Sequence, residues 1–149
     1  MVLLDSNIFI LDRFFPHDSL YQQNKAFIDK LASIDASISS FTLLEICGVA
    51  SFRLSTDELS SWLFGFGTIY SVAILDLHGL RIYDGEAWWS IFVGAVATNI
   101  AKRLTFGDAL HLREAESYQV EAIVTWNTKD FARRTQLKVL TPGAFLRRS

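Results

Sequence analysis

Acidic side chains that could bind a hard metal ion occur at three separated places in this sequence of 149 residues. Asp5 directly follows Val2 to Leu4, a short apolar run that is typical of a buried β-strand. Glu45 interrupts the segment FTLLEICGVA, which is otherwise apolar or small, and Asp108 lies early in a predicted helix, TFGDALHLREAE. Carboxylate oxygens are the ligands that Mg²⁺ and Mn²⁺ prefer, so the three acids together predict a metal site.

Each acid also has an ordinary structural role. Asp is a frequent N-cap, and an acid in a first helical turn is favoured by the helix dipole, so Asp5 and Asp108 alone favour neither interpretation. Glu45 is more informative, because glutamate is seldom buried without a partner. We expect it to be buried beside a cation, a metal or a proton, with a solvent-facing stripe on its helix as the alternative.

A second group of polar residues follows a predicted strand near the C-terminus, in AIVTWNTKDF. Thr125 and Asn127 can hydrogen-bond water at a metal site, and Asp130 can either bind the metal or cap the segment that follows. His111 shares a helix face with Asp108, but a hard cation prefers oxygen ligands, so His111 is interpreted as a polar packing residue.

The charge is unevenly distributed along the chain. Residues 1–118 carry 8 Lys and Arg against 14 Asp and Glu, a net charge of −6, whereas residues 119–149 carry 6 against 2, a net charge of +4. An acidic body with a basic edge suits a metal site beside a phosphate-binding rim, and an ordinary solvated surface is the alternative. Lys129, Arg133 and Arg134 are the candidate phosphate contacts.

The elements that must position these residues alternate between short apolar runs and amphipathic segments. We expect strands at Val2 to Leu4, Ala36 to Ser39, Ser71 to Leu75, Ala122 to Thr125 and Leu137 to Leu140. We expect helices at Tyr21 to Ser33, Thr42 to Phe52, Ser55 to Phe64 with Gly65 and Gly67 ending it, a long apolar helix reaching Arg103, and Thr105 to Tyr118. This alternation predicts an α/β fold with a mainly parallel sheet flanked by helices, whose functional crevice lies beyond the carboxyl ends of the strands.

The chain contains no repeat and no Pro- or Gly-rich linker, so residues 1–149 are expected to form a single domain. The longest apolar stretch, Ala87 to Ala101, is shorter than the roughly 20 residues that span a bilayer and is expected to be a buried core helix. The N-terminus lacks a basic region, and Cys47 is the one cysteine. Both features favour a cytoplasmic protein without a membrane segment.

Five segments together resemble the PIN-domain ribonuclease family, and more specifically the VapC-type toxins of VapBC toxin and antitoxin pairs. They are LLDSNIFI, TLLEICG, TFGDALHLREAE, VTWNTKDF and VLTPGAFL, which span essentially the whole chain. The resemblance implies a Rossmann-like three-layer sandwich, Mg²⁺ or Mn²⁺ as cofactor, and cleavage of RNA to leave a 5′ phosphate.

Carried over residue by residue, the acidic set of the family corresponds to Asp5, Glu45 and Asp108, with a fourth position in TWNTKDF. There the chain has Asn127 where other members have an acid, which puts a second metal in doubt and leaves Asp130 as a substitute. We expect Asp5 and Asp108 to bind metal, Glu45 to act through metal or its water, and Asn127 or Asp130 to position water. The chemical reason is that a divalent cation lowers the pKa of bound water and neutralises the charge that develops on a phosphodiester.

Three other interpretations are open. A degenerate PIN domain that binds RNA or a partner without cutting is consistent with Asn127. A receiver-like phosphoacceptor switch would use Asp76 in SVAILDLHGLRIYDG, but a receiver needs an acidic pair after its first strand, and this chain has Leu4 and Asp5. A phosphatase of the haloacid dehalogenase type needs a second Asp two residues after Asp5, where Asn7 stands.

Partners are suggested by the apolar composition, because 50% of the residues are hydrophobic and only 20% are charged. Most of the aromatic residues are expected in the core, but aromatics beside glycines at a helix end also suit an interface. The candidates are Trp62, Leu63, Phe64, Phe66, Trp88 and Trp89. We expect a homodimer with a groove that receives an apolar helix or tail of a small antitoxin.

Overall fold

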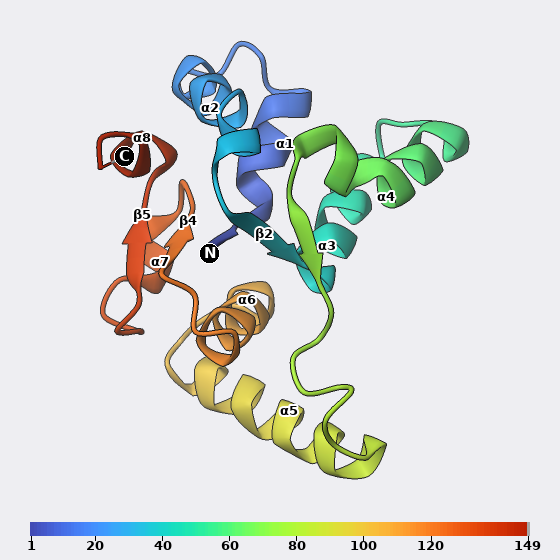
Figure 1. The fold of residues 1–149 in the computed structure, drawn as a ribbon, viewed down its shortest axis with the longest axis vertical. Helices are drawn as coiled ribbons and strands as arrows, with labels where there is room; N and C mark the ends of the chain where they lie inside the picture. Colours follow the sequence, from blue (N-terminus) through green and yellow to red (C-terminus); the bar gives the residue numbers. More distant parts are fainter. Residues whose placement is uncertain (149) are drawn as a thin grey trace.

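The computed structural model describes residues 1–148, which form a five-stranded parallel sheet with helices on both faces (Figure 1). The strands are β1 (Val2–Leu4), β2 (Ala36–Ser39), β3 (Ala73–Leu75), β4 (Ala122–Val124) and β5 (Lys138–Leu140). Across the sheet they lie in the order β3-β2-β1-β4-β5, and each neighbouring pair is parallel. The predicted α/β class is confirmed, and β1 occupies the centre of the sheet.

The helices are α1 (Ser6–Phe14), α2 (Tyr21–Ile28), α3 (Ser40–Ala50), α4 (Thr56–Tyr70), α5 (Gly85–Ala101), α6 (Phe106–Ser117), α7 (Thr128–Phe131) and α8 (Pro142–Leu146), with a 3₁₀ turn at Leu31–Ser33. One face of the sheet carries α1 to α4 and α8, and the other carries α5, α6 and α7. Within residues 1–148, none of these helices is both long and apolar enough to cross a membrane.

The strands bury side chains on both faces, because successive residues of a strand point to opposite sides. Val2 and Leu4 of β1 pack in the core beneath α1 to α4, whereas Leu3 packs in the core beneath α5 and α6. All three side chains are at most 3% exposed. Burial on both faces is typical of a central parallel strand and explains why the first apolar run has no polar alternation.

The long apolar helix α5 is only half covered, which corrects the expectation of a buried core helix. Trp88, Phe92 and Val96 recur every four residues and pack against α6 and the sheet. Trp89 and Val93, one position further along, are 59% and 44% exposed. The helix therefore presents an apolar face to solvent.

Helix ends deviate from the predictions by more than two residues at two places. The helix expected at Tyr21 to Ser33 is divided, because α2 ends at Ile28 and a 3₁₀ turn covers Leu31–Ser33. The helix that begins with the Ser55 capping box does not end at Gly65, but continues as α4 to Tyr70. A glycine weakens a helix by only about 1 kcal/mol relative to alanine, and tertiary packing outweighs that cost here.

The aromatic face of α4 explains why the helix continues. Trp62, Phe66 and Tyr70 are spaced four residues apart, all are buried, and Phe66 and Tyr70 both contact the ring of Phe9 in α1. The helix ends only at Ser71, which adopts the left-handed conformation with φ of 55°. The expected interface residues Trp62, Phe66 and Trp88 are thus core residues, whereas Phe64 and Trp89 are exposed.

The two glycines of α4 should respond oppositely to alanine. A Cβ at Gly67 would lie 2.9 Å from the backbone oxygen of Val72, so Gly67→Ala should destabilise the chain by about 1 to 3 kcal/mol. A Cβ at Gly65 would meet only the Ile69 side chain at 3.5 Å, so Gly65→Ala should be neutral or stabilising by up to about 1 kcal/mol. Urea unfolding of both variants checks this, and equal effects would contradict the described close approach.

Candidate functional site

The predicted site lies at the carboxyl end of the central strand. Asp5 follows β1, and its backbone N–H donates to the carbonyl of Val124, the last residue of β4, at 3.0 Å. Because β1, β2 and β4 are parallel neighbours, the segments that follow them begin at the same edge of the sheet. These segments are α1, α3 and the turn leading to α7.

The carboxylate of Asp5 does not cap the helix that it precedes. Asp5 occupies the N-cap position of α1, but its side chain makes no capping hydrogen bond. Instead, its Oδ2 accepts from Thr125 Oγ1 at 2.6 Å and from Asn7 Nδ2 at 2.7 Å. Asp5 therefore does not act as an N-cap through its side chain.

Thr125 organises the centre of the site. Its hydroxyl donates to Asp5 Oδ2, and the same oxygen accepts from Asn7 Nδ2 at 3.0 Å and from the backbone N–H of Asn127 at 2.9 Å. Asn7 in turn accepts from the backbone N–H of Trp126 at 3.2 Å. Residues 118 to 120 positions apart in the chain thus fix the orientation of one carboxylate.

Glu45 lies on α3 and is solvent-exposed, so the expectation that it is buried is wrong. Its carboxylate nevertheless lies against α6, since a Cβ on Gly107 would be 3.3 Å from Glu45 Oε1. Partial desolvation raises the pKa of the Glu45 carboxyl, a hydrogen bond from Ser6 opposes this, and the negative charges of Asp5 and Asp108 raise it further. The three predicted acids therefore act on one another electrostatically.

Asp108 lies in the first turn of α6. Thr105 caps this helix by accepting from the Asp108 N–H at 3.3 Å, and its hydroxyl donates to Asp108 Oδ2 at 2.6 Å. Desolvation raises the pKa of Asp108, the Thr105 hydrogen bond opposes it, and the charges of Asp5 and Asp130 add to the increase. The capping bonds hold the carboxylate at the mouth of the site.

The fourth position is shared by two residues. Asn127 is exposed and is the N-cap residue of α7, but its side chain makes no capping hydrogen bond. Asp130, on α7, is half-buried and close enough to raise the pKa of Asp108. Of the two, Asp130 therefore brings the additional negative charge to this edge.

The acidic group has no ion-pair partner within residues 1–148. In the part of the chain that the structure describes, no Lys or Arg forms an ion pair with Asp5, Glu45 or Asp108. Among the same residues, no three Asp, Glu, His or Cys side chains are already arranged to hold a metal ion. The site is thus a concentration of uncompensated negative charge rather than a preformed cage.

His111 lies one helical turn after Asp108 and is 6% exposed. Its Nδ1 is 3.3 Å from Thr42 Oγ1, and its ring lies beside Phe131. Desolvation lowers the pKa of the imidazole, although the charges of Asp5 and Asp108 oppose this. The position agrees with the interpretation of His111 as a polar residue in the core.

The predicted phosphate contacts differ in their exposure and in the hydrogen bonds that they already make. Lys129 and Arg133 are exposed, and Arg133 adopts a left-handed backbone conformation with φ of 65°. Arg134 is partly covered, and its guanidinium donates to the carbonyl of Lys102 at 2.9 Å and to the carbonyl of Asp130. Arg134 thus joins the segment after α7 to the C-terminal end of α5, which leaves fewer N–H groups for a ligand.

Asp76 lies outside this acidic group. It follows β3, the edge strand, with β2 between it and β1. Its carboxylate is exposed and forms a surface ion pair with Arg81 at 2.6 Å. A receiver-type site would need Asp76 beside the acid that follows the first strand, so this arrangement argues against that alternative.

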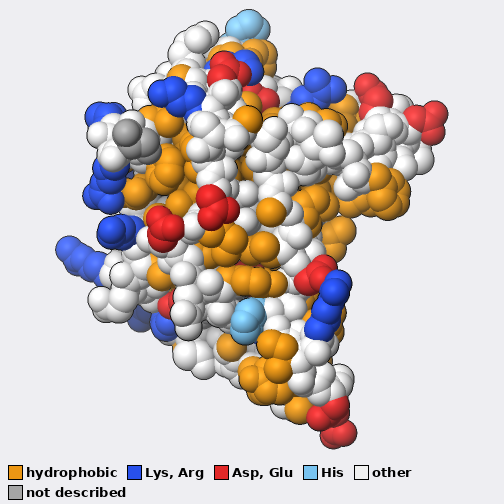
Figure 2. Space-filling view, in the orientation of Figure 1, with side chains coloured by type: hydrophobic (Ala, Val, Ile, Leu, Met, Phe, Trp, Pro, Cys, Tyr) orange, Lys and Arg blue, Asp and Glu red, His pale blue; other side chains and the backbone are white. Residues whose placement is uncertain are grey.

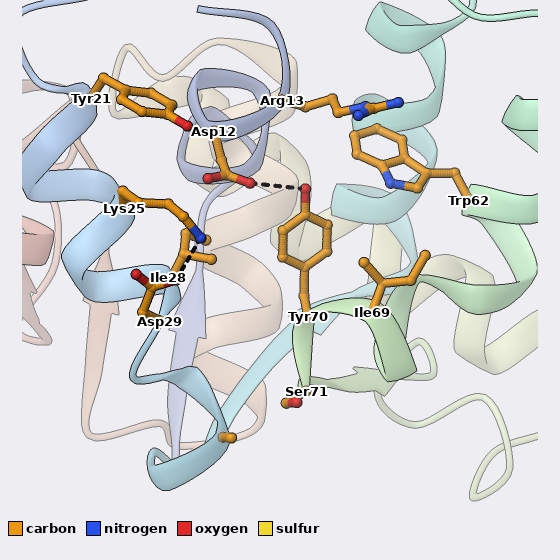
Figure 3. Close-up of a pocket in the computed structure, with 11 residues that line it drawn as sticks. Asp12, Arg13, Tyr21, Lys25, Ile28, Asp29, Trp62, Ile69, Tyr70 and Ser71 are labelled. Carbon is orange, nitrogen blue, oxygen red and sulfur yellow. Dashed lines mark hydrogen bonds and ion pairs between the residues drawn. The ribbon is translucent and has the colours of Figure 1, made fainter. Parts of the chain in front are cut away.

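A cavity of about 510 Å³ lies between α1, α2 and α4, away from the acidic group (Figure 3). Its polar groups pair with one another: the Tyr70 hydroxyl donates to Asp12 at 3.3 Å, and Lys25 forms an ion pair with Asp29 at 2.5 Å. Burial, followed by the charge of Asp12, raises the pKa of Tyr70. None of the predicted site residues lines this cavity.

Several residues at the site were not predicted to contact the acids. The hydroxyl of Ser6 lies within 3.3 Å of Asp5 Oδ1 and also reaches Glu45, and Asn7 bonds Asp5 rather than only shaping the turn. The contacts of Ser6 and Asn7 could have been predicted from their position in the sequence, because small polar residues directly after a central strand lie at the crevice. The approach of Glu45 to Gly107 had no such signal, since it depends on helix packing.

No protein-family profile matches this chain, and no curated protein matches it. Solved structures do match. A chain in the structure of FitAB bound to the IR36 DNA fragment has a TM-score of 0.63 and 17% identity, covering 96% of both chains.

Two further structures are similar. One is VapBC2 from Rickettsia felis bound to a DNA fragment from their promoter, with a TM-score of 0.62, 22% identity, and coverage of 93% of this chain and 97% of that one. The other is a toxin-antitoxin complex from Klebsiella pneumoniae, with a TM-score of 0.60, 22% identity, and coverage of 95% and 98%. Over nearly its whole length, the chain therefore has the fold of the PIN-domain toxins.

Proposed function

We propose that this protein is a metal-dependent endoribonuclease and the toxin of a type II toxin-antitoxin pair. The observation that carries the proposal is the group of three carboxylates, Asp5, Glu45 and Asp108, at the carboxyl end of the central strand. None of them forms an ion pair with a Lys or Arg of residues 1–148. The likeness to toxin-antitoxin structures supports the same function.

The donor set fits a hard divalent cation in its chemistry. Its ligands would be oxygens of Asp5 and Asp108, with Glu45 binding directly or through water. Desolvation raises the pKa values of Glu45 and Asp108, and the negative charges of neighbouring acids raise them further; a bound cation would oppose both effects. Within residues 1–148 these side chains are not already arranged around an ion.

When bound, Mg²⁺ or Mn²⁺ would activate water and neutralise the charge that develops on the phosphate. The chain's own residues would supply orientation. Thr125 and Asn7 hold the Asp5 carboxylate in one position, so that its free lone pairs face a fixed direction. We propose that Asn127, whose side chain makes no capping bond, or Asp130 orients the attacking water.

RNA would approach along the basic segment Lys129 to Arg134, which begins in α7 and continues after it. We propose that Lys129 and Arg133 contact phosphates, with Arg134 contributing through the N–H groups that it does not use for the backbone. Figure 2 shows a further gathering of Lys and Arg side chains along the edge made by β5 and α8. Lys138 lies in β5, and Arg147 and Arg148 follow α8.

Lys129→Ala and Arg133→Ala should weaken RNA binding and flatten its dependence on salt. Each lost phosphate contact should reduce the slope of log affinity against log salt concentration by about 0.7 for a single strand. Binding isotherms at several salt concentrations measure this, and affinity for Mn²⁺ should not change. An unchanged slope in both variants would show that the basic segment is only solvated surface. Arg134→Ala should lower stability in addition, because it removes backbone hydrogen bonds.

The test of the proposed nuclease is incubation of the purified chain with RNA and Mn²⁺, followed by analysis of the new ends. We expect internal cuts that leave 5′ phosphates. RNA that is bound but stays intact would instead support the alternative of a non-cutting PIN domain, which Asn127 and the lack of a preformed cage favour. In cells, induced expression should arrest growth, and the Asp5→Asn form should not.

We propose two protein partners, a second copy of the chain and a small antitoxin. Large apolar side chains are exposed on α4 and α5, where Phe64 is 85% and Trp89 59% exposed, and Phe52 after α3 is 91% exposed. Figure 2 shows hydrophobic side chains gathered over these regions. Such aromatic surface suits an interface. Light scattering tests the dimer, and co-purification with the product of a neighbouring gene tests the antitoxin.

A further inference from the structure

A buried chain of hydrogen bonds connects α3 to α6. Ser39 Oγ lies 3.0 Å from Thr42 Oγ1, and Thr42 Oγ1 lies 3.3 Å from His111 Nδ1. The three residues are 0%, 4% and 6% exposed, so water does not compete for these bonds. Ser39 is fixed by the sheet, since it is the last residue of β2 and the N-cap of α3.

This chain of bonds lies one turn from two of the acids. Thr42 precedes Glu45 by three residues in α3, and His111 follows Asp108 by three residues in α6. Residues three apart in a helix are neighbours on its surface, with Cβ atoms roughly 5 to 6 Å apart. The Thr42–His111 bond therefore joins the two helices directly behind the carboxylates that they carry.

The same two helices approach closely at Gly107, where a Cβ would lie 3.3 Å from Glu45 Oε1. A shift of α3 relative to α6 would thus move the Glu45 carboxylate relative to Asp108. The Thr42–His111 bond is the side-chain hydrogen bond that opposes such a shift between these helices within residues 1–148.

Core filling alone does not account for an imidazole at this position. His111 Nε2 is buried and has no hydrogen-bond partner within residues 1–148, and a buried polar atom without a partner is destabilising. An apolar side chain of the same shape would avoid that cost but would lose the bond to Thr42. The residue type is therefore explained by the bond that Nδ1 makes.

We propose that Thr42 and His111 are positioning residues that set the separation of Glu45 and Asp108 by locking α3 against α6. The inference rests on the proposed function, because the separation matters only if the acids bind a common ion. The two residues act through the helices and do not themselves touch the metal or the RNA.

The variants separate the bond from the general integrity of the core. Thr42→Val removes the bond while keeping the shape of the side chain, and His111→Phe removes it while keeping a flat ring of somewhat larger size. Thr42→Ser keeps the hydroxyl, and His111→Asn keeps a polar atom with the same connectivity as Nδ1. Asn99→Leu is the matched control, because it removes another buried bond to α6, from Asn99 Nδ2 to the Ala109 carbonyl at 3.3 Å.

Calorimetric titration of the full chain with Mn²⁺ is the first measurement. Thr42→Val and His111→Phe should each weaken Mn²⁺ binding about tenfold, the typical effect of losing a group that orients a metal ligand. Because both act through one bond, the double variant should be no weaker than the weaker single variant. Thr42→Ser, His111→Asn and Asn99→Leu should retain the affinity of the unmodified chain.

RNA cleavage supplies the second measurement. At saturating Mn²⁺ the positioning variants should lower kcat and leave KM for RNA within about twofold, since they do not touch RNA. Folded Thr42→Val and His111→Phe with unchanged Mn²⁺ affinity would overturn the proposal, as would an equal loss in Asn99→Leu.

The outcomes also separate this inference from the proposed function. If the unmodified chain binds Mn²⁺ but leaves RNA intact, the nuclease function fails, and the expected pattern of Mn²⁺ affinities still supports the positioning role. If the unmodified chain does not bind Mn²⁺, both are overturned.

Discussion

Asp5→Asn and Asp108→Asn should each lower the rate of RNA cleavage by about a hundredfold or more while leaving the fold intact. A hundredfold corresponds to about 2.7 kcal/mol of lost transition-state stabilisation. The reason is that each change removes one negative charge and one oxygen ligand from the proposed metal site. Because Asn keeps the shape of Asp and one of its oxygens, it can still accept from Thr125 at position 5 and from Thr105 at position 108, so the fold should be retained.

Asp76→Asn is the matched control for these variants. It removes an acid that also follows a strand of the same sheet, but one that lies at the edge and forms only a surface ion pair with Arg81. Cleavage rates of the three variants under saturating Mn²⁺ should separate Asp5 and Asp108 from Asp76. Equal activity in all three variants would show that Asp5 and Asp108 do not take part in cleavage.

The largest effect on stability is expected at a buried ion pair behind the site. Arg113 and Glu114 of α6 form a contact in which the side chains are 5% and 0% exposed. Glu114 Oε2 also accepts from the His78 N–H at 3.1 Å, and Arg113 donates to the His78 carbonyl at 3.0 Å. The pair therefore fastens the segment between β3 and α5 to α6, together with Trp88, whose indole N–H donates to the same carbonyl at 3.0 Å.

Glu114→Ala should destabilise the chain by about 3 to 5 kcal/mol, because it leaves the Arg113 guanidinium buried without its counter-charge. That is a large part of the roughly 5 to 15 kcal/mol that stabilises a typical domain. Replacing both residues by apolar ones, as in Arg113→Met with Glu114→Leu, should cost less than Glu114→Ala alone. Urea unfolding measures both, and a loss below about 1 kcal/mol in Glu114→Ala would contradict the described pair.

The strands and the location of the acids were predictable because they depend on local sequence. Val2 to Leu4 is apolar on both faces, which indicates a central parallel strand, and an acid directly after such a strand must lie at the crevice. The correct placement of Asp5 followed from these two rules. Asp108 followed in the same way from the helix start at Thr105.

The errors arose where packing between distant segments decides the outcome. Gly65 and Gly67 were expected to end a helix. Instead, α4 continues past both glycines to Tyr70, because Phe66 and Tyr70 pack against the ring of Phe9. Glu45 was expected to be buried because its neighbours are apolar, yet Leu44 beside it is itself 59% exposed. The apolar residues around a position therefore do not show whether that position is buried, because many apolar residues lie on protein surfaces.

The role of charged residues was also set by tertiary contacts. The sequence assigned Arg134 to RNA, whereas its guanidinium already bonds the backbone of Lys102 and Asp130. Glu114 is buried, and its carboxylate accepts from the His78 N–H in the segment between β3 and α5. Neither contact is visible in spacing or helical periodicity, because the partners come from other elements.

The most direct test of the account is RNA cleavage by one preparation of the protein, first in chelator and then after Mg²⁺ or Mn²⁺ is added back. We expect no cleavage in chelator, recovery with either ion, and no recovery in the Asp5→Asn variant. Full cleavage in chelator by the unmodified chain, freed of contaminating nuclease, would contradict it.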